Sequence, residues 1–264
     1  MIRIVFFDVD GTLLSDKVVP DSTRHAISLL QAQGITTALA TGRPEFELHE
    51  LREQLSIDWA ITCNGAHLGH RGQTVTGTAF STERIDEWVE RAQRTPGHTL
   101  LLYGAQHTFS TSSIADCPYL SQADEEIGFL EPIPVSEAGR LPEIYQCILF
   151  APEEEASPYT ERYADELYQH RWHPWALDLT PQGINKSTGV QLLLDRLGIS
   201  REEAAAFGDG KNDLEMIQHV GLGIAMGNSC PELLACARHV TAHVKDDGIL
   251  QAVTNLILPK SLRV

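Results

Sequence analysis

The chain has 264 residues, 42% of them apolar, which is enough for one large globular domain or two smaller ones with a buried core. Its formal net charge of −16 argues against the extended basic face that a nucleic acid or an anionic membrane requires, so we expect neither as a partner. The five cysteines contain no Cys-x-x-Cys pair, and no apolar run is long enough for a membrane span, so a cytoplasmic protein is expected. We expect it to be a monomer or a homodimer.

The first predicted element is a strand over residues 2–7, whose β-branched and aromatic side chains are typical of a buried strand in a parallel sheet. Asp8 and Asp10 follow it, at the edge where such sheets bind ligands. Strand alternation places both carboxylates on one side, where their repulsion favours a bound divalent cation. Gly11 permits a tight turn whose N–H groups can face an anion, although a simple polar turn is the alternative.

Two more helix and strand pairs follow. The pattern that begins at Pro20 and stops at Gly34 predicts a helix, and residues 35–40 predict a second buried strand, parallel to the first through a right-handed crossover. We expect a helix at about 44–55 and a strand at 59–62. The three strand ends therefore point the same way, and they carry Asp8 with Asp10, Thr41-Gly42-Arg43, and Asn64-Gly65-Ala66.

The middle of the chain changes character. Residues 66–79 predict a hairpin that turns at Arg71-Gly72-Gln73. No element is predicted for the Pro- and acid-rich stretch at 116–143. The remaining pattern predicts helices at 83–94 and 158–169 and strands at 99–103, 106–111, 144–151 and 175–180. Helices and antiparallel hairpins inserted between parallel units indicate a separate α+β domain.

The alternation of helix and strand resumes at Asn185-Lys186. We predict helices at 188–197, 213–219 and 231–237, and strands at 204–207, 221–226 and 239–241. The strand at 204–207 ends in Gly208-Asp209-Gly210, which is followed by Lys211-Asn212-Asp213.

These strand ends together predict one site. Taken alone, Asp209 and Asp213 are as well explained by a surface turn and a helix cap. Beside Asp8 and Asp10 at the same sheet edge they favour Mg²⁺, which takes oxygen ligands and often shares its shell with a phosphate. The Thr41 hydroxyl, the glycines that follow the strands and the Lys186 ammonium supply the groups that bind a phosphate.

The motifs, in this order, resemble those of the haloacid dehalogenase superfamily of aspartate-nucleophile phosphatases: residues 7–14, 40–43, Lys186 and 208–216. Within it, the form Ala-Thr-Gly-Arg, the segment Ala225-Met226-Gly227-Asn228 and the segment Asp246-Asp247-Gly248-Ile249 resemble the Cof-type subgroup of sugar-phosphate and related phosphatases. The resemblance covers about residues 1–80 and 183–264, whereas the middle matches only in length and position.

The resemblance implies an α/β fold with a Rossmann-like, three-layer parallel-sheet core at 1–81 and 183–264 and an inserted α+β cap at 82–182, of the C2 type and its larger B subtype. Chain spacing independently supports this placement. About 30 residues separate Asp10 from Thr41, enough for one helix and one strand, whereas about 145 separate Thr41 from Lys186. A cap would exclude water from the nucleophile and supply specificity contacts.

The residues and the resemblance agree on a mechanism. Asp8 attacks phosphorus to give an aspartyl phosphate, and Asp10 acts as acid and then as base. Mg²⁺ is expected on Asp8, the Asp10 carbonyl and Asp209, with Asp213 as a support or a direct ligand. The phosphate-binding and substrate-binding residues are expected to be Gly11, Thr41, Gly42, Asn64, Lys186, Asn212 and Arg43, for which a salt bridge to a neighbouring acid is an equal alternative.

Two other functions fit part of this pattern: a phosphomutase or phosphotransferase of the same superfamily, and a regulatory protein that binds phosphate without turnover. The presence of Asp8, Asp10 and Lys186 favours an enzyme. The cap segment has no readable motif, so the metabolite stays unidentified. Trp172 and Trp175 are expected to pack within the cap, with a substrate platform as the alternative.

Overall fold

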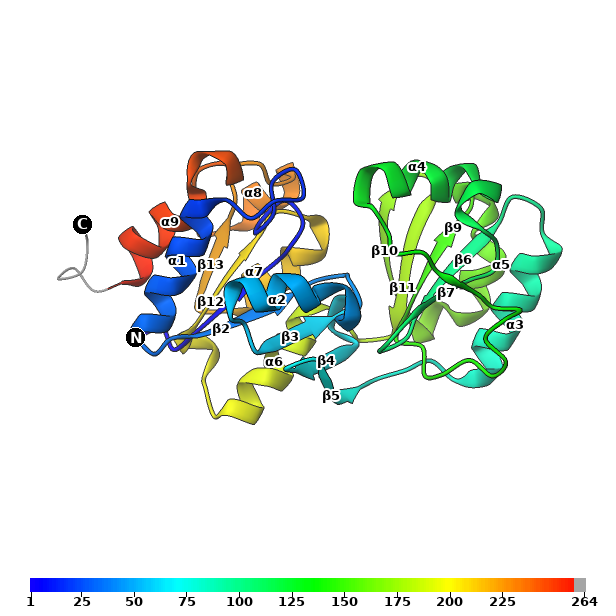
Figure 1. Ribbon diagram of the computed structural model, residues 1–264, viewed down its shortest axis with the longest axis horizontal. Coiled ribbons are helices and arrows are strands. Elements are labelled where there is room, and N and C mark those ends of the chain that lie inside the picture. The colour runs from blue at the N-terminus through cyan, green and yellow to red at the C-terminus, as the bar shows by residue number, and fades with distance from the viewer. Residues whose placement is uncertain (259–264) are drawn as a thin grey trace.

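The computed structural model describes residues 1–258, which form two β-sheets with their own helices (Figure 1). The larger sheet contains eight strands: β1 (Ile4–Phe7), β2 (Thr36–Ala40), β3 (Trp59–Thr62), β4 (His67–His70), β5 (Gln73–Gly77), β12 (Ala204–Gly208), β13 (Leu222–Ala225) and β14 (His239–Val240). Their order is β14-β13-β12-β1-β2-β3-β4-β5, parallel from β14 to β3 and antiparallel beyond. The strand order reverses at β1, which is where open α/β sheets bind ligands.

Helices cover both faces of the larger sheet. One face packs against α1 (Asp21–Ala32), α2 (His49–Leu55) and α9 (Gly248–Ala252), and the other against α6 (Lys186–Leu197), α7 (Leu214–His219) and α8 (Pro231–Cys236). Strand β1 serves both faces, because successive side chains of a strand point to opposite sides. Val5 and Phe7 belong to one apolar cluster, and Ile4 and Phe6 to the other. The predicted three-layer, Rossmann-like core is confirmed.

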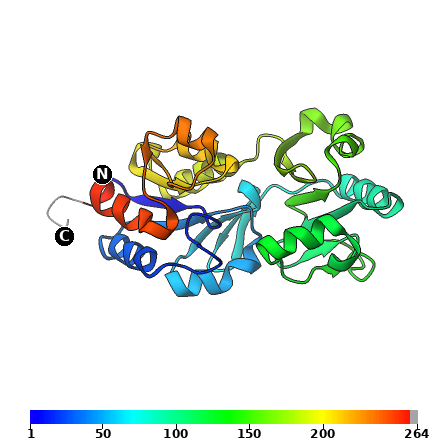
Figure 2. The same ribbon diagram turned by 90° about the horizontal axis from the view of Figure 1, so that it is seen from above.

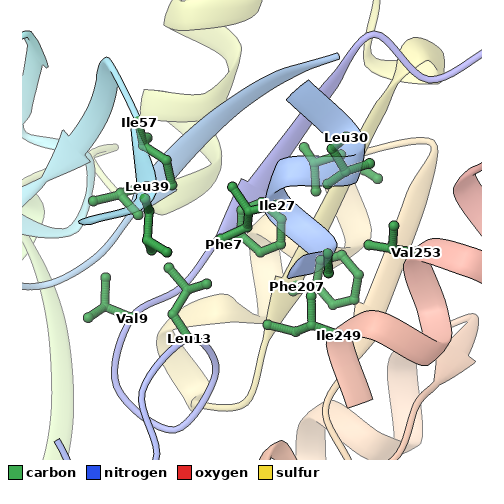
Figure 3. Close-up of a cluster of buried hydrophobic side chains, with 14 of the residues drawn as sticks. Phe7, Val9, Leu13, Ile27, Leu30, Leu39, Ile57, Phe207, Ile249 and Val253 are labelled. Carbon is green, nitrogen blue, oxygen red and sulfur yellow. The ribbon is translucent and has the colours of Figure 1, made fainter. Parts of the chain in front are cut away.

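The cluster under α1 fixes the central strands side by side (Figure 3). Phe7 of β1 and Phe207 of β12 stack with their ring centroids 5.3 Å apart, and both side chains are fully buried. Burial of one such side chain is worth about 1.5–3 kcal/mol. Asp8 directly follows Phe7, and Asp209 lies two residues after Phe207. The packing of the two rings therefore brings the two carboxylates close together.

The smaller sheet contains β6 (Thr99–Tyr103), β7 (Thr108–Ser110), β8 (Ile133–Pro134), β9 (Gln146–Phe150), β10 (Leu167–His173) and β11 (Ala176–Pro181). Their order is β10-β11-β9-β6-β7-β8, antiparallel except between β7 and β8. Helix α3 (Thr82–Arg94) and helix α4 (Pro118–Ile127) pack on this sheet through different apolar clusters, and α5 (Ser157–Thr160) is a single turn. Two chain segments, 78–81 and 182–185, join the two units (Figure 2).

Short turns complete the structure. There are 3-10 segments at 45–48, 63–65, 114–116, 153–155, 161–166, 201–203, 211–213 and 244–246, and a π-helical turn at 253–257. The predicted hairpin turn is present between β4 and β5, where Arg71 and Gly72 adopt φ values of 52° and 77°. Within residues 1–258, no helix combines the length and apolar character that crossing a bilayer requires.

Two sequence-based predictions in the middle of the chain need correction. The helix predicted at 158–169 is wrong in its last three residues, because the helical turns end at Glu166 and Leu167 begins β10. Pairing with β11, in which Leu167 lies opposite Pro181, overrides the local helical preference. The stretch at 116–143, predicted without elements, contains α4 and β8. Pro118 in the first turn and Gly128 at a φ of 75° mark the ends of α4.

Candidate active site

The predicted site residues converge on the carboxyl ends of the central strands. Asp8 and Asp10 follow β1, Thr41 follows β2 and Asp209 follows β12, while Lys186 begins α6. A cavity of about 440 Å³ lies between this edge and the smaller sheet. The predicted residues that line it are Asp8, Asp10, Thr41, Gly42, Arg43 and Asn212.

Lys186 joins two carboxylates. Its Nζ lies 2.6 Å from Asp8 Oδ1 and 2.6 Å from Asp213 Oδ1, and the residue is 1% exposed. Although burial lowers the pKa of Lys186, the carboxylates of Asp213 and Asp8 raise it above its ordinary value, so the ammonium is retained. Burial raises the pKa of Asp8 well above its usual range, and Lys186 opposes this shift. The neighbouring carboxylates of Asp213 and Asp209 add to the rise in the Asp8 pKa.

The sequence around Lys186 explains its position at the start of α6. Asn185 caps this helix by accepting from the N–H groups of Ser187 and Thr188, and the Thr188 hydroxyl completes the capping box. Gly65 allows close approach, since a Cβ there would lie 2.1 Å from the Asn185 carbonyl oxygen. The Asn64-Gly65 turn therefore supports the helix start that carries Lys186.

Asp8, Asp209 and Asp213 form an acidic cluster in which one carboxylate oxygen from each lies within 4.8 Å of the others. Thr12 Oγ1 donates to Asp209 Oδ1 at 2.7 Å. Asp213 uses both oxygens: Oδ1 accepts from Lys186, and Oδ2 accepts from the N–H groups of Asp209 and Gly210, each at 2.9 Å. Burial, with a contribution from Asp213, raises the pKa of Asp209 to about 6. Oxygen donors with excess negative charge fit Mg²⁺.

Gly11 is required by the same cluster. Its φ is +83°, and an added Cβ would lie 2.2 Å from Asp209 Oδ2. The Gly11 carbonyl oxygen accepts from Asn228 Nδ2 at 2.8 Å, which ties the turn after β1 to the loop after β13. The Asn228 segment thus has a structural role at the site.

Asp10 and Arg43 form a two-pronged salt bridge. Arg43 Nε lies 2.8 Å from Asp10 Oδ2, and Nη2 lies 2.7 Å from Oδ1. The salt bridge considered for Arg43 is therefore present, and the side chain also lines the cavity. The Arg43 N–H donates to Thr41 Oγ1 at 3.1 Å, so the turn after β2 positions the guanidinium.

Asn64 lies between the two units. Its Nδ2 donates to Gln146 Oε1 on β9 and to Asp178 Oδ2 on β11, each at 3.0 Å. Its Oδ1 accepts from Asn212 Nδ2 at 3.0 Å. Both amide hydrogens thus lie on acceptors of the smaller sheet, and phosphate binding by Asn64 stays a prediction.

The sequence missed several residues of the smaller sheet that line the cavity, notably Gln146 and Asp178. A lone acid within the apolar stretch Ala176-Leu177-Asp178-Leu179 was the available signal for Asp178. Trp172 lines the cavity and donates its Nε1–H to Asp178 Oδ1 at 2.9 Å. Trp175 packs instead, stacking on Tyr119 with ring centroids 5.5 Å apart.

Comparison with known proteins identifies relatives along the whole chain. A family profile described as haloacid dehalogenase-like hydrolase matches residues 5–253. The predicted phosphatase YkrA of Bacillus subtilis (strain 168) is 35% identical over 98% of this chain and 99% of its own. The 5-amino-6-(5-phospho-D-ribitylamino)uracil phosphatase YitU of the same strain is 27% identical over 93% of this chain and 94% of its own.

Solved structures give the same result. A protein of Geobacillus kaustophilus HTA426 has a TM-score of 0.86 at 35% identity, covering 97% of this chain and 99% of its own. The subclass IIB sugar phosphatase BT4131 has a TM-score of 0.80 at 28% identity, covering 95% and 97%. The matches of sequence and of fold extend over both units. The chain belongs to the haloacid dehalogenase-like hydrolases.

Proposed function

We propose that this protein is a Mg²⁺-dependent phosphatase of small phosphorylated metabolites that works through an aspartyl phosphate on Asp8. Its family membership and its relatives YkrA, YitU and BT4131 support a phosphatase. The observation that carries the mechanism is the buried pairing of Lys186 Nζ with Asp8 Oδ1 at 2.6 Å, at a carboxylate that lines the cavity.

In the first step, an Asp8 oxygen forms a bond to phosphorus while the bond from phosphorus to the leaving oxygen breaks. Asp10 donates a proton to that leaving oxygen. In the second step, water attacks the aspartyl phosphate, Asp10 accepts the proton, and Asp8 is released with inorganic phosphate. The buried ammonium of Lys186 stabilises the negative charge of the phosphoryl group in both steps. Thr41, Gly42 and Asn212, which line the cavity, bind the phosphoryl oxygens.

Asp8, Asp209 and the backbone carbonyl of Asp10 would hold Mg²⁺, which supplies neutralisation of the phosphoryl charge when bound. Asp213 supports this set from behind, because it accepts hydrogen bonds from Lys186 and from the N–H groups of Asp209 and Gly210 and so orders the residues around the metal ligands. Arg43 holds the Asp10 carboxylate beside the cavity through two hydrogen bonds. Arg43 is thus a positioning residue for the acid and base.

We further propose that residues 82–182 act as the cap. The smaller sheet contributes the apolar and polar wall opposite Asp8, including Ile148, Trp172 and Asp178. Hydrogen bonds from Asn64 to Gln146 and Asp178 hold this wall over the site. A covered site excludes bulk water from the nucleophile and brings specificity contacts to the leaving group.

The test is Asp8→Asn, assayed with p-nitrophenyl phosphate and a sugar phosphate in the presence of Mg²⁺. The amide keeps the shape but is a poor nucleophile, so we expect kcat to fall by several powers of ten. Asp86→Asn, which changes an exposed acid on α3, is the matched control and should keep the wild-type rate. Retention of a tenth of the wild-type rate by Asp8→Asn would rule out the covalent mechanism.

The product distinguishes a phosphatase from a phosphomutase or phosphotransferase. Release of one inorganic phosphate for each ester consumed, with excess sugar present, is expected. Transfer of the phosphoryl group to the added sugar, detected as a second phosphorylated sugar, would contradict the assignment to hydrolysis.

A further inference from the structure

Two carboxylates that the proposed mechanism does not use line the cavity: Asp178 on β11 and Glu47 in the turn at 45–48. Asp178 is 8% exposed, and its two oxygens accept from Trp172 Nε1 at 2.9 Å and Asn64 Nδ2 at 3.0 Å. Each carboxylate oxygen can accept a further hydrogen bond. Among residues 1–258, no cation forms a salt bridge with either carboxylate.

The cations around the cavity are already paired with other acids. The pairs are Arg43 with Asp10, Lys186 with Asp8 and Asp213, Lys211 with Glu232 at 2.8 Å, and Arg171 with Glu153 at 3.7 Å. His170 also lines the cavity, but burial lowers its pKa to about 4, so its imidazole is neutral at physiological pH. Among the described residues that line the cavity, Asp178 and Glu47 are therefore the carboxylates that form no ion pair, and both add negative charge when they are ionised.

An apolar surface faces the same space. Ile127, Phe129, Ile148 and Trp172, all from the smaller sheet and its helix α4 region, line the cavity. An apolar and aromatic surface packs against the C–H face of a carbon skeleton, while carboxylates accept hydrogen bonds from its hydroxyl or ammonium groups. The two surfaces together suit a polyhydroxylated compound.

We propose that Asp178 and Glu47 form a subsite that binds hydroxyl or ammonium groups of the leaving group and rejects a second negative charge. The preferred substrates are then phosphate monoesters of neutral or cationic polyhydroxylated compounds, and not bisphosphates or phosphorylated sugar acids. This inference rests on the proposed phosphatase function. Its physical basis is that a carboxylate shielded from bulk water repels a second negative charge, whereas it attracts a hydroxyl or ammonium group.

The test compares sorbitol 6-phosphate with 6-phosphogluconate, two open-chain esters that differ only in a terminal CH₂OH or carboxylate. The assay is run at pH 8, because burial raises the pKa of Asp178 and of Glu47 to about 7 and both are then ionised. We expect kcat/KM for sorbitol 6-phosphate to be about 100-fold higher. The ratio between the two esters is the readout, since effects on the shared chemical step cancel.

Glu47→Gln and Asp178→Asn remove one charge each with little change in shape, and each should lower this ratio about tenfold. Glu47→Gln loses no hydrogen bond seen among residues 1–258, so it gives the test even if Asp178→Asn folds poorly. Asp165→Asn, which removes an exposed charge of the smaller unit away from the cavity, should leave the ratio unchanged.

The outcomes separate this inference from the proposed function. A wild-type ratio near one, with Asp8-dependent turnover of both esters, would overturn the subsite and leave the phosphatase intact. A high ratio that neither Glu47→Gln nor Asp178→Asn lowers would also overturn it. Failure of the wild type to hydrolyse either ester or p-nitrophenyl phosphate with Mg²⁺ would overturn both.

Discussion

Replacement of Lys186 by methionine tests the central ion pair of the site. The change keeps an unbranched side chain, one atom shorter, but leaves Asp8 and Asp213, both 2.6 Å from the lost ammonium, as uncompensated buried carboxylates. Removal of one partner from a buried ion pair typically costs about 3–5 kcal/mol. We expect a loss of this size in the free energy of unfolding, measured by urea denaturation at pH 8 in the presence of EDTA, together with a loss of turnover.

The matched control is Lys245→Met. Lys245 lies 2.8 Å from Asp16, but its side chain is 56% exposed, and such surface pairs contribute at most about 1 kcal/mol. Lowering the pH should reduce the deficit of Lys186→Met, because protonation of the carboxylates removes their charge, and Mg²⁺ should reduce it by binding to them. A loss below about 1 kcal/mol at pH 8 in EDTA would refute the inferred dependence on a buried ion pair.

Three further changes probe the surroundings. Gly11→Ala should cost about 1–3 kcal/mol and weaken Mg²⁺ binding in calorimetry, because the new Cβ would meet Asp209 at a φ of +83°; unchanged affinity would contradict this. Burial lowers the pKa of His67 to about 4, so its stabilising contribution is present above pH 6.5 and is lost as the pH falls toward 4. Relative to His67→Gln, the wild type should lose about 2–3 kcal/mol over that range, and parallel stability curves would disprove it. Tyr168→Phe removes a 2.6 Å hydrogen bond to Glu215 between the two units, and should cost about 1–3 kcal/mol in urea unfolding; wild-type stability would show that the bond contributes nothing.

Much of the core could be predicted because the order of strands and helices along the chain also determines where the strand ends lie in the sheet. Parallel strands align their carboxyl ends, so residues after β1, β2 and β12 meet wherever those strands lie side by side. Chain order alone then brings Asp8, Thr41 and Asp209 to one edge. Helical and strand periodicities identified the elements between them, and the glycine and proline signals identified most of their ends.

The smaller unit was predicted less well because distant pairing decides its structure. Residues 161–169 contain good helix formers, yet Leu167 and its successors pair with β11. Gln146 and Asp178 are single polar residues in apolar strands, and no spacing connects them with Asn64, 82 and 114 residues away in the chain. Only the arrangement of the two sheets shows that they meet.

The chain separation between Asp8 and Lys186, 178 residues, has a consequence for synthesis of the protein. Strand β1 pairs with β2 early, but its other edge waits for β12, which begins only at Ala204. All six strands of the smaller sheet lie between β5 and β12 in the chain. The smaller sheet can therefore form before β12 pairs with β1. We expect nascent chains shorter than about 210 residues to expose an unpaired apolar strand edge and to lack a complete site, so that activity arises late and chaperones have a defined binding target.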